Sequence, residues 1–168
     1  MSTDDDWRFA DVLEANTDYA AAFNLEGLAA RAARGLAILT CMDSRIEPLA
    51  MLGLQPGDAK ILRNAGARVT DDVLRTLTLA TYLLGVERAM VIAHTNCLMA
   101  RMSESDVRKA LRDVGGPDSE LARYLVTNDQ EATLRSDVER VRSLPDFDRL
   151  DVGGFIYDVH TGRLTQLC

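Results

Sequence analysis

The sequence predicts an α/β fold in which a central, mainly parallel β-sheet is flanked by helices. Short apolar runs alternate with longer amphipathic stretches, as they do in βαβ units. The chain has 168 residues, of which 47% are hydrophobic, and it shows no internal repeat or low-complexity linker. This length suffices for one sizeable core and is too short for two full domains, so we expect a single domain over residues 1–168.

An N-terminal helical arm, residues 1–34, is expected to precede the sheet core of residues 35–168. Residues 11–23 and 25–34 are rich in Ala, Leu and Glu and contain few helix breakers. Such an arm can cover its own sheet or wrap a neighbouring subunit, and the sequence leaves both possibilities open.

Strands are predicted at residues 35–40 (GLAILT), 60–63 and 88–93 (RAMVIA). The first and third are continuous apolar runs, which are typical of strands covered on both faces of a parallel sheet. Residues 155–159 and 163–167, on either side of a short turn, are expected to close the domain as a hairpin.

Helices are predicted between these strands, where Ser, Thr and Asp caps precede amphipathic stretches. One begins after Thr70 and runs to Gly85, and the two aspartates after Thr70 suit the positive end of its dipole. The other predicted helices are a short one from Glu47-Pro48 to Gly53, one from Ser103 or Ser105 to about Val114, and residues 129–142.

Composition and charge argue against several classes of protein. The formal net charge is −7 and no Lys/Arg cluster stands out, so no nucleic-acid partner is expected. No apolar run approaches the roughly 20 residues needed to span a bilayer, and residues 1–6 lack the basic region of a secretory signal. We therefore expect no membrane partner and a cytoplasmic location, where thiols are more often ligands, nucleophiles or buried residues than disulfide partners.

Two side chains suited to metal binding directly follow predicted strands. Cys41 comes after residues 35–40 and His94 after residues 88–93. Because the carboxyl ends of parallel strands share one edge of a sheet, both are expected to meet in one crevice, and Cys97 is near enough to turn toward it. Two thiolates and an imidazole suit Zn²⁺ with an open fourth position. The alternative is an inert buried thiol, because His-x-x-Cys alone is a weak motif.

The CMDSR segment adds a carboxylate and a guanidinium to this set. In an extended segment alternate residues point to one side, which would group Cys41, Asp43 and Arg45 and turn Met42 and Ser44 away. Asp43 can then accept a hydrogen bond from zinc-bound water, and Arg45 can orient that carboxylate through a bidentate pair. Taken alone, a loop ion pair or an Asp cap is the simpler interpretation.

CMDSR followed later by HTNC resembles the β-carbonic anhydrase family, which pairs Cys-x-Asp-x-Arg with a later His-x-x-Cys. The resemblance continues through RNAGARVTDDVLRTL, residues 63–77, and through GGFIYDVHTGRL near the end of the chain. It covers roughly residues 35–167. The short chain is similar to the compact, actinobacterial-type branch of the family.

The resemblance implies a zinc lyase that reversibly hydrates carbon dioxide to bicarbonate and a proton. It implies one Zn²⁺ per chain on Cys41, His94 and Cys97, with Asp43 and Arg45 as the catalytic pair. The metal would lower the pKa of its bound water, and the resulting hydroxide would attack CO₂. The family also has a closed arrangement in which the aspartate ligates zinc. A homodimer or a dimer of dimers is the implied assembly.

The resemblance also implies that the RNAG loop, with Asn64, Ala65 and Gly66, lines the substrate pocket; without it, an ordinary Gly turn is the simpler interpretation. Leu98 departs from the family, which usually has Gly directly after the last cysteine ligand. Leu98 can narrow the pocket, shift the following helix or point into the core.

Two other functions remain open on these grounds. Close relatives use the same zinc site to hydrolyse carbonyl sulfide or carbon disulfide, and an apolar Leu98 beside the metal keeps this activity as an alternative. A zinc-binding protein without catalytic activity is a third possibility. The intact CMDSR segment argues against that third possibility, because a purely structural site does not need its Asp and Arg.

Overall fold

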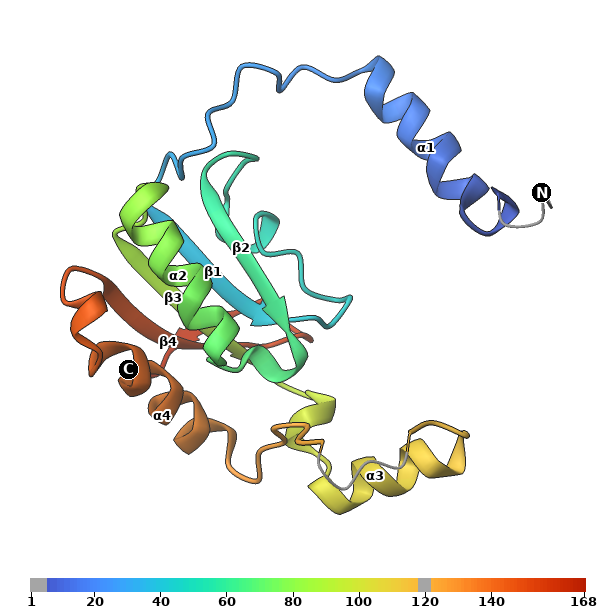
Figure 1. The fold of residues 1–168 in the computed structure, drawn as a ribbon, viewed down its shortest axis with the longest axis vertical. Helices are drawn as coiled ribbons and strands as arrows, with labels where there is room; N and C mark the ends of the chain where they lie inside the picture. The colour runs from blue at the N-terminus through green and yellow to red at the C-terminus, as the bar shows by residue number, and fades with distance from the viewer. Residues whose placement is uncertain (1–5, 118–121) are drawn as a thin grey trace.

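The computed structural model describes residues 6–117 and 122–168, so residues 1–5 of the expected arm and 118–121 of the expected core lie outside the described residues. A five-stranded sheet with strand order β2-β1-β3-β4-β5 forms its centre (Figure 1). The strands are β1 (Leu36–Cys41), β2 (Ala59–Asn64), β3 (Arg88–His94), β4 (Asp151–Tyr157) and β5 (Leu164–Gln166). Strands β1 to β4 are parallel and β5 is antiparallel, which confirms the predicted mainly parallel α/β sheet.

Helices α2 and α4 lie against the same face of the sheet, whereas α1 and α3 stand away from it (Figure 1). The α-helices are α1 (Ala10–Ala21), α2 (Asp71–Leu83), α3 (Glu104–Asp113) and α4 (Gln130–Arg142). The short 3₁₀ turns are η1 (Asp6–Phe9), η2 (Ala50–Leu52), η3 (Ala65–Ala67), η4 (Leu98–Ala100) and η5 (Pro145–Phe147). None of the helices in the described ranges has the length and apolar character needed to span a bilayer.

The capping residues that the sequence indicates do begin these helices. The Thr70 hydroxyl accepts the backbone N–H of Val73 at 3.4 Å. Ser103 forms a reciprocal capping box with Asp106, and Asp129 caps α4 through its carboxylate. Each cap satisfies an N–H group that the first helical turn leaves without a partner.

The apolar runs in β1 and β3 are explained by burial of the sheet on both faces. All six residues of β1 are buried. Its side chains alternate between two clusters: Ala37 and Leu39 pack beneath α2 and α4, while Leu36 and Ile38 pack on the opposite face with Ile92. A central strand therefore buries its side chains on both faces rather than at every second position, and most of them are apolar.

The expected helix at residues 25–34 is wrong, because this segment is a loop. Its backbone is held by tertiary hydrogen bonds instead of helical ones. The N–H of Ala33 donates to the carbonyl of Gly57 at 3.0 Å. The N–H of Arg34 donates likewise to Asp58 at 2.9 Å, just ahead of β2. These bonds to a distant loop outweigh the local helix propensity.

Replacement of Ile92 tests the importance of the second cluster. Ile92 is fully buried, so Ile92→Ala should lower the free energy of unfolding by about 2–5 kcal/mol through lost burial and a residual cavity. Urea denaturation at fixed protein concentration measures this change. Leu83→Ala, at a site that is 65% exposed, is the control and should change stability by less than about 0.5 kcal/mol. Equal losses in both variants would contradict this account of the core.

Candidate metal centre

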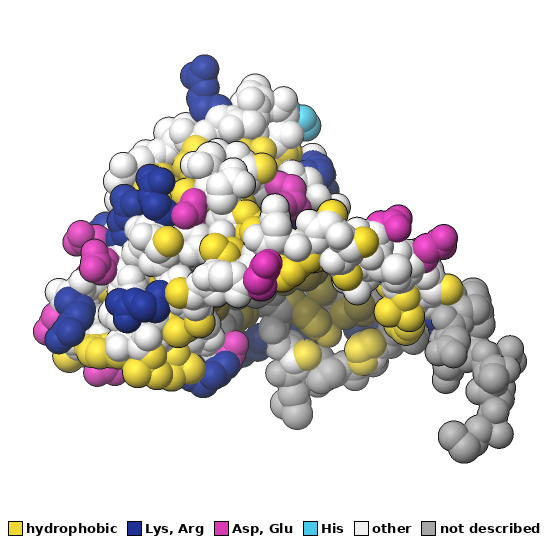
Figure 2. Space-filling view, turned by 90° about the horizontal axis from the view of Figure 1, so that it is seen from above, with side chains coloured by type: hydrophobic (Ala, Val, Ile, Leu, Met, Phe, Trp, Pro, Cys, Tyr) yellow, Lys and Arg dark blue, Asp and Glu magenta, His cyan; other side chains and the backbone are white. Residues whose placement is uncertain are grey.

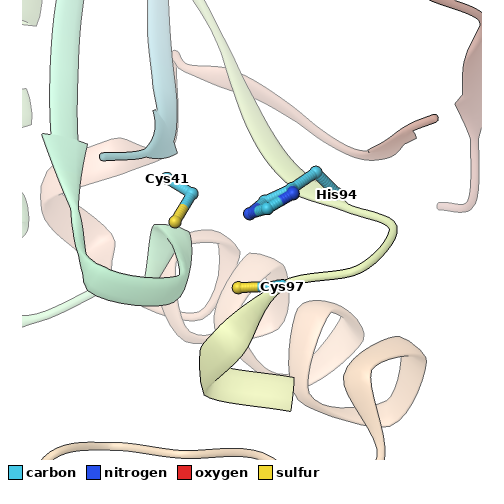
Figure 3. Close-up of side chains that lie close together, drawn as sticks. All are labelled: Cys41, His94 and Cys97. Atoms are coloured by element: carbon cyan, nitrogen blue, oxygen red, sulfur yellow. The ribbon is translucent and has the colours of Figure 1, made fainter. Parts of the chain in front are cut away.

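The sheet brings Cys41, His94 and Cys97 together. Cys41 ends β1 and His94 ends β3, and these neighbouring strands are parallel, so both side chains lie at the same sheet edge. Asn96, with a positive φ of 57°, turns the chain so that Cys97 faces the same point. The three possible ligand atoms lie within 4.8 Å of one another, and Figure 3 shows the side chains directed toward one another.

His94 has the hydrogen bonding and burial expected of a metal ligand. Its side chain is 1% exposed, and Nε2 has no hydrogen-bond partner. The other ring nitrogen, Nδ1, donates to the carbonyl of Thr95 at 2.9 Å, which leaves the Nε2 lone pair free to coordinate. A buried nitrogen without a partner is costly, and a metal ion satisfies it. One imidazole and two thiols with an open fourth position are a donor set that fits zinc.

The two thiols have different pKa values because they share a hydrogen bond. Donation from Cys97, with a smaller contribution from the N–H of Gly66, lowers the pKa of Cys41 to about 4 despite its burial. The same bond to Cys41, together with burial, raises the pKa of Cys97. Coordination of zinc by both sulfurs therefore requires loss of the proton that Cys97 donates to Cys41.

Asp43 and Arg45 form a bidentate pair beside this group. Arg45 donates from Nε to Oδ1 at 2.9 Å and from Nη2 to Oδ2 at 2.7 Å, and its backbone N–H donates to Oδ1 at 3.0 Å. These bonds hold the pKa of Asp43 well below its ordinary value. Oδ2 of Asp43 lies 3.9 Å from Nε2 of His94, so the ionised carboxylate borders the position that a metal would occupy.

The segment that carries this pair is not extended throughout, contrary to the sequence-based expectation. It turns after Asp43, whose carbonyl accepts the N–H of Ile46 at 3.1 Å. The turn, rather than strand alternation, brings Arg45 onto Asp43. Met42 and Ser44 consequently do not face away but line the same cavity.

Arg63 is a supporting residue that the sequence analysis did not single out. It lies near the end of β2 and donates from Nε to the carbonyl of Cys41 at 3.1 Å. Its Nη2 donates to the carbonyl of Asp43 at 2.6 Å. One guanidinium thus fixes the spacing between the thiol and the carboxylate. Its place at the start of the RNAG motif was the only sequence signal for this role. Its hydrogen-bond acceptors are backbone carbonyls, which any residue type provides, so no pattern of side chains indicates them.

The residues of the RNAG loop, Asn64, Ala65 and Gly66, make different contacts. Asn64 folds the loop on itself: its side chain donates to the carbonyl of Arg68 at 2.7 Å and accepts the Arg68 N–H at 2.8 Å. Ala65 lines the cavity, whereas Gly66 directs its N–H at Sγ of Cys41 from 3.3 Å. Gly66 has a φ of 79°, and a Cβ there would lie 3.3 Å from Met99, so glycine is the residue that fits.

A cavity of about 340 Å³ opens beside the two candidate cysteine ligands. It is lined by Cys41, Met42, Asp43, Ser44, Arg45, Ala65, Cys97, Leu98 and Met99. Leu98 is 56% exposed and Met42 is 66% exposed, so two apolar side chains stand at the mouth. Leu98 therefore lies in the cavity wall rather than in the core.

Charged side chains of both signs share the molecular surface. Basic and acidic side chains are intermingled on the face shown in Figure 2. A one-sign basic patch is the usual footprint of a nucleic-acid-binding surface, and this face does not carry one.

Fold and site together are those of a metal-binding α/β protein, with three candidate ligands and an acidic group beside an open cavity. The sequence model of the carbonic anhydrase family matches residues 36–122. β-Carbonic anhydrase 1 of Mycobacterium tuberculosis is 34% identical over 160 residues, which cover 94% of this chain and 96% of that protein. The chain belongs to the β-carbonic anhydrases, a family of zinc lyases.

Other comparisons agree on the fold and add a second activity among the relatives. The crystal structure of a carbonic anhydrase from Streptococcus mutans matches with a TM-score of 0.88 and 35% identity, over 95% of this chain and 97% of that one. A carbon disulfide hydrolase from Saccharolobus solfataricus is 46% identical over 88 residues, which cover 52% of this chain and 43% of that enzyme.

Removal of a ligand tests the metal site. Cys41→Ala and His94→Ala should each lose zinc, because the two remaining donors cannot hold the ion tightly. Metal analysis of purified protein measures zinc per chain. Cys168→Ala, which removes the third cysteine from a position outside the group, is the matched control and should retain one zinc. A Cys41→Ala protein with one tightly bound zinc would refute the ligand set.

Proposed function

We propose that this protein hydrates carbon dioxide to bicarbonate and a proton, with zinc held by Cys41, His94 and Cys97. The observation that carries this proposal is the Asp43–Arg45 pair at the open side of the ligand group. A structural zinc site has four protein ligands and no need of such a pair. Family membership and relatives named as carbonic anhydrases support the same reaction.

Bound zinc supplies a Lewis acid that brings the pKa of a coordinated water toward neutrality. The protein's own residues position the reactants. Asp43 is kept ionised by Arg45, so its Oδ2 accepts a hydrogen bond from the reacting water and orients it. Arg45 also donates to the carbonyl of Asn96 at 3.3 Å, which ties the pair to the loop between His94 and Cys97.

The cavity wall favours a small, apolar substrate. Met42, Leu98 and Met99 supply apolar side chains to the cavity wall, and Asp43 and Arg45 supply its charged groups. This combination of apolar lining and a few oriented polar groups is typical of small-molecule sites. A linear, uncharged molecule such as CO₂ fits it better than a large polar substrate.

Stopped-flow CO₂ hydration tests the proposal on protein with quantified zinc, at pH 7 and at about pH 8.5, where zinc hydroxide is favoured. Asp43→Ala should retain zinc and lower kcat by about 10²-fold or more, since the water loses its orienting group. Asp113→Asn, on the exposed surface of α3, is the control and should keep full activity. Absence of turnover at both pH values in zinc-loaded wild type would refute the proposal.

Carbon disulfide or carbonyl sulfide hydrolysis is the second candidate, favoured by Leu98 at the cavity mouth and by the relatives named carbon disulfide hydrolase. The same preparation should be assayed with CO₂, COS and CS₂. Efficient turnover of a sulfur substrate with little CO₂ hydration would establish this candidate. Leu98→Gly would then show whether the leucine sets that preference.

We also propose a single domain over residues 1–168 whose arm pairs with a second copy, giving a homodimer that can assemble as a dimer of dimers. Helix α1 has no buried residue, and Phe9, Val12 and Leu13 are exposed. A groove of about 770 Å³, floored by apolar residues that include Met90, lies at the sheet. The exposed apolar side chains of the arm and the groove are both buried if the arm of each chain covers the groove of its partner.

Opposite charges support this pairing. The first 26 residues carry seven Asp or Glu and one Arg, whereas the groove is lined by Arg34, Arg88 and Arg142 together with Asp148 and Asp151, a small excess of positive charge. A cytoplasmic location is proposed as well, because Cys41 and Cys97 must stay reduced to bind zinc and both are free thiols.

Charge on the apolar face of α1 tests the dimer. Phe9→Asp combined with Leu13→Asp should raise the dimer dissociation constant by about tenfold or more, because both side chains would lose apolar burial against the partner. Sedimentation velocity across a concentration series measures the shift. Asp113→Asn, at an exposed position on α3 outside both the arm and the groove, should leave the dimer intact. Identical behaviour of the double variant and wild type would exclude the arm from the interface.

A further inference from the structure

Asp137 is a buried carboxylate that the proposed reaction does not use. It lies in the middle of α4 and is 6% exposed. Arg68 donates to it from Nε at 2.7 Å and from Nη2 at 3.3 Å, and the backbone N–H of Val69 donates at 3.2 Å. Burial of a charge is costly unless it is paired and hydrogen-bonded, as it is here. Its described partners all belong to the segment that follows the RNAG loop.

Arg68 connects this carboxylate to the loop. Its backbone forms both hydrogen bonds with the side chain of Asn64 that close the loop. Its guanidinium, fixed on Asp137, also donates from Nη1 to the carbonyl of Leu125 at 2.9 Å. Arg68, at the end of the loop, is therefore held by Asp137 in α4 and by Leu125 in the segment that precedes α4.

The loop between these anchors has an unfavourable backbone. Gly66 and Ala67 both have positive φ, at 79° and 57°, and Ala67 is 3% exposed. A left-handed alanine persists only where the surrounding structure holds it. The conformation matters for the site because it aims the Gly66 N–H at Sγ of Cys41.

We infer that Asp137 is a positioning residue of the metal centre: it holds the RNAG loop so that Gly66 stays bonded to the sulfur of Cys41. This hydrogen bond disperses negative charge from the ligand sulfur and fixes its direction. Groups that orient a ligand in this way affect metal affinity although they do not touch the ion. The inference rests on the proposed zinc ligands but not on the identity of the substrate.

The test compares zinc-loaded, full-length wild type with Asp137→Asn, which keeps the shape of the side chain but removes the charge that pairs with the guanidinium. Zinc release to a chelator should become about 10–100-fold faster. Hydrogen exchange of the Gly66 amide should accelerate more than that of Val91, a core amide in β3 that reports global opening. Asp113→Asn removes an exposed carboxylate paired with Lys109 and should change neither quantity.

A double variant separates positioning from general destabilisation. Arg68→Gln leaves the buried carboxylate unpaired, whereas Arg68→Gln combined with Asp137→Asn removes both charges. If the two residues act as one unit, the double variant should release zinc no faster than Arg68→Gln alone. If Asp137→Asn does not fold, Arg68→Lys replaces it in the test. Lysine keeps the positive charge but cannot donate two parallel hydrogen bonds to the carboxylate, so zinc release and hydrogen exchange of the Gly66 amide should both accelerate.

The inference fails if Asp137→Asn, or Arg68→Lys in its place, unfolds at a lower temperature yet keeps wild-type zinc release and wild-type relative protection of Gly66. Asp137 would then stabilise the fold without positioning the metal centre. This result differs from failure of the zinc site itself, in which wild type would hold no zinc. It also differs from a wrong substrate, because neither measurement uses one.

Discussion

The parallel pairing of β1 with β3 is the constraint on which the metal centre depends. Their register sets Thr40 opposite Ile92. Cys41, which follows Thr40, and His94, two residues after Ile92, therefore lie at the same edge of the sheet. A slip of one residue in either strand would send its last side chain to the opposite face, because side chains alternate along a strand. The apolar contacts of both sheet faces oppose such a slip. The burial of β1 and β3 therefore serves the site as well as stability.

Once the strands are set, the remaining geometry is imposed by hydrogen bonds to backbone. Arg63 spans two carbonyls of the CMDSR segment, and the Gly66 N–H meets the sulfur of Cys41 from the next loop. Left-handed backbone at Ala67 is tolerated because hydrogen bonds hold Gly66 and Arg68 on either side of it, and at Asn96 because its carbonyl accepts a bond from Arg45. The site thus combines strained turns with rigid neighbours, so that its side chains are oriented before a metal or substrate arrives.

The features that the sequence could predict are those with a local signal. The apolar runs located β1 and β3, Thr70 and Ser103 marked helix starts, and the residues after the strands identified the three side chains that the structure brings together. Features that depend on partners far away in the sequence could not be predicted. Residues 25–34 exchange helical bonds for bonds to another loop, and Asp137 finds its arginine 69 positions away, a distance at which no periodicity applies.

The position of Leu98 shows how one such scaffold can serve different small substrates. Cys97 is held by the turn at Asn96 and by its place in the ligand group, whereas the next side chain enters η4 and is 56% exposed at the cavity mouth. A change at this position alters the shape and polarity of the entrance without moving a ligand, since its side chain is not packed in either core cluster. The shape of the entrance can therefore vary at the rim while the candidate ligand group stays constant.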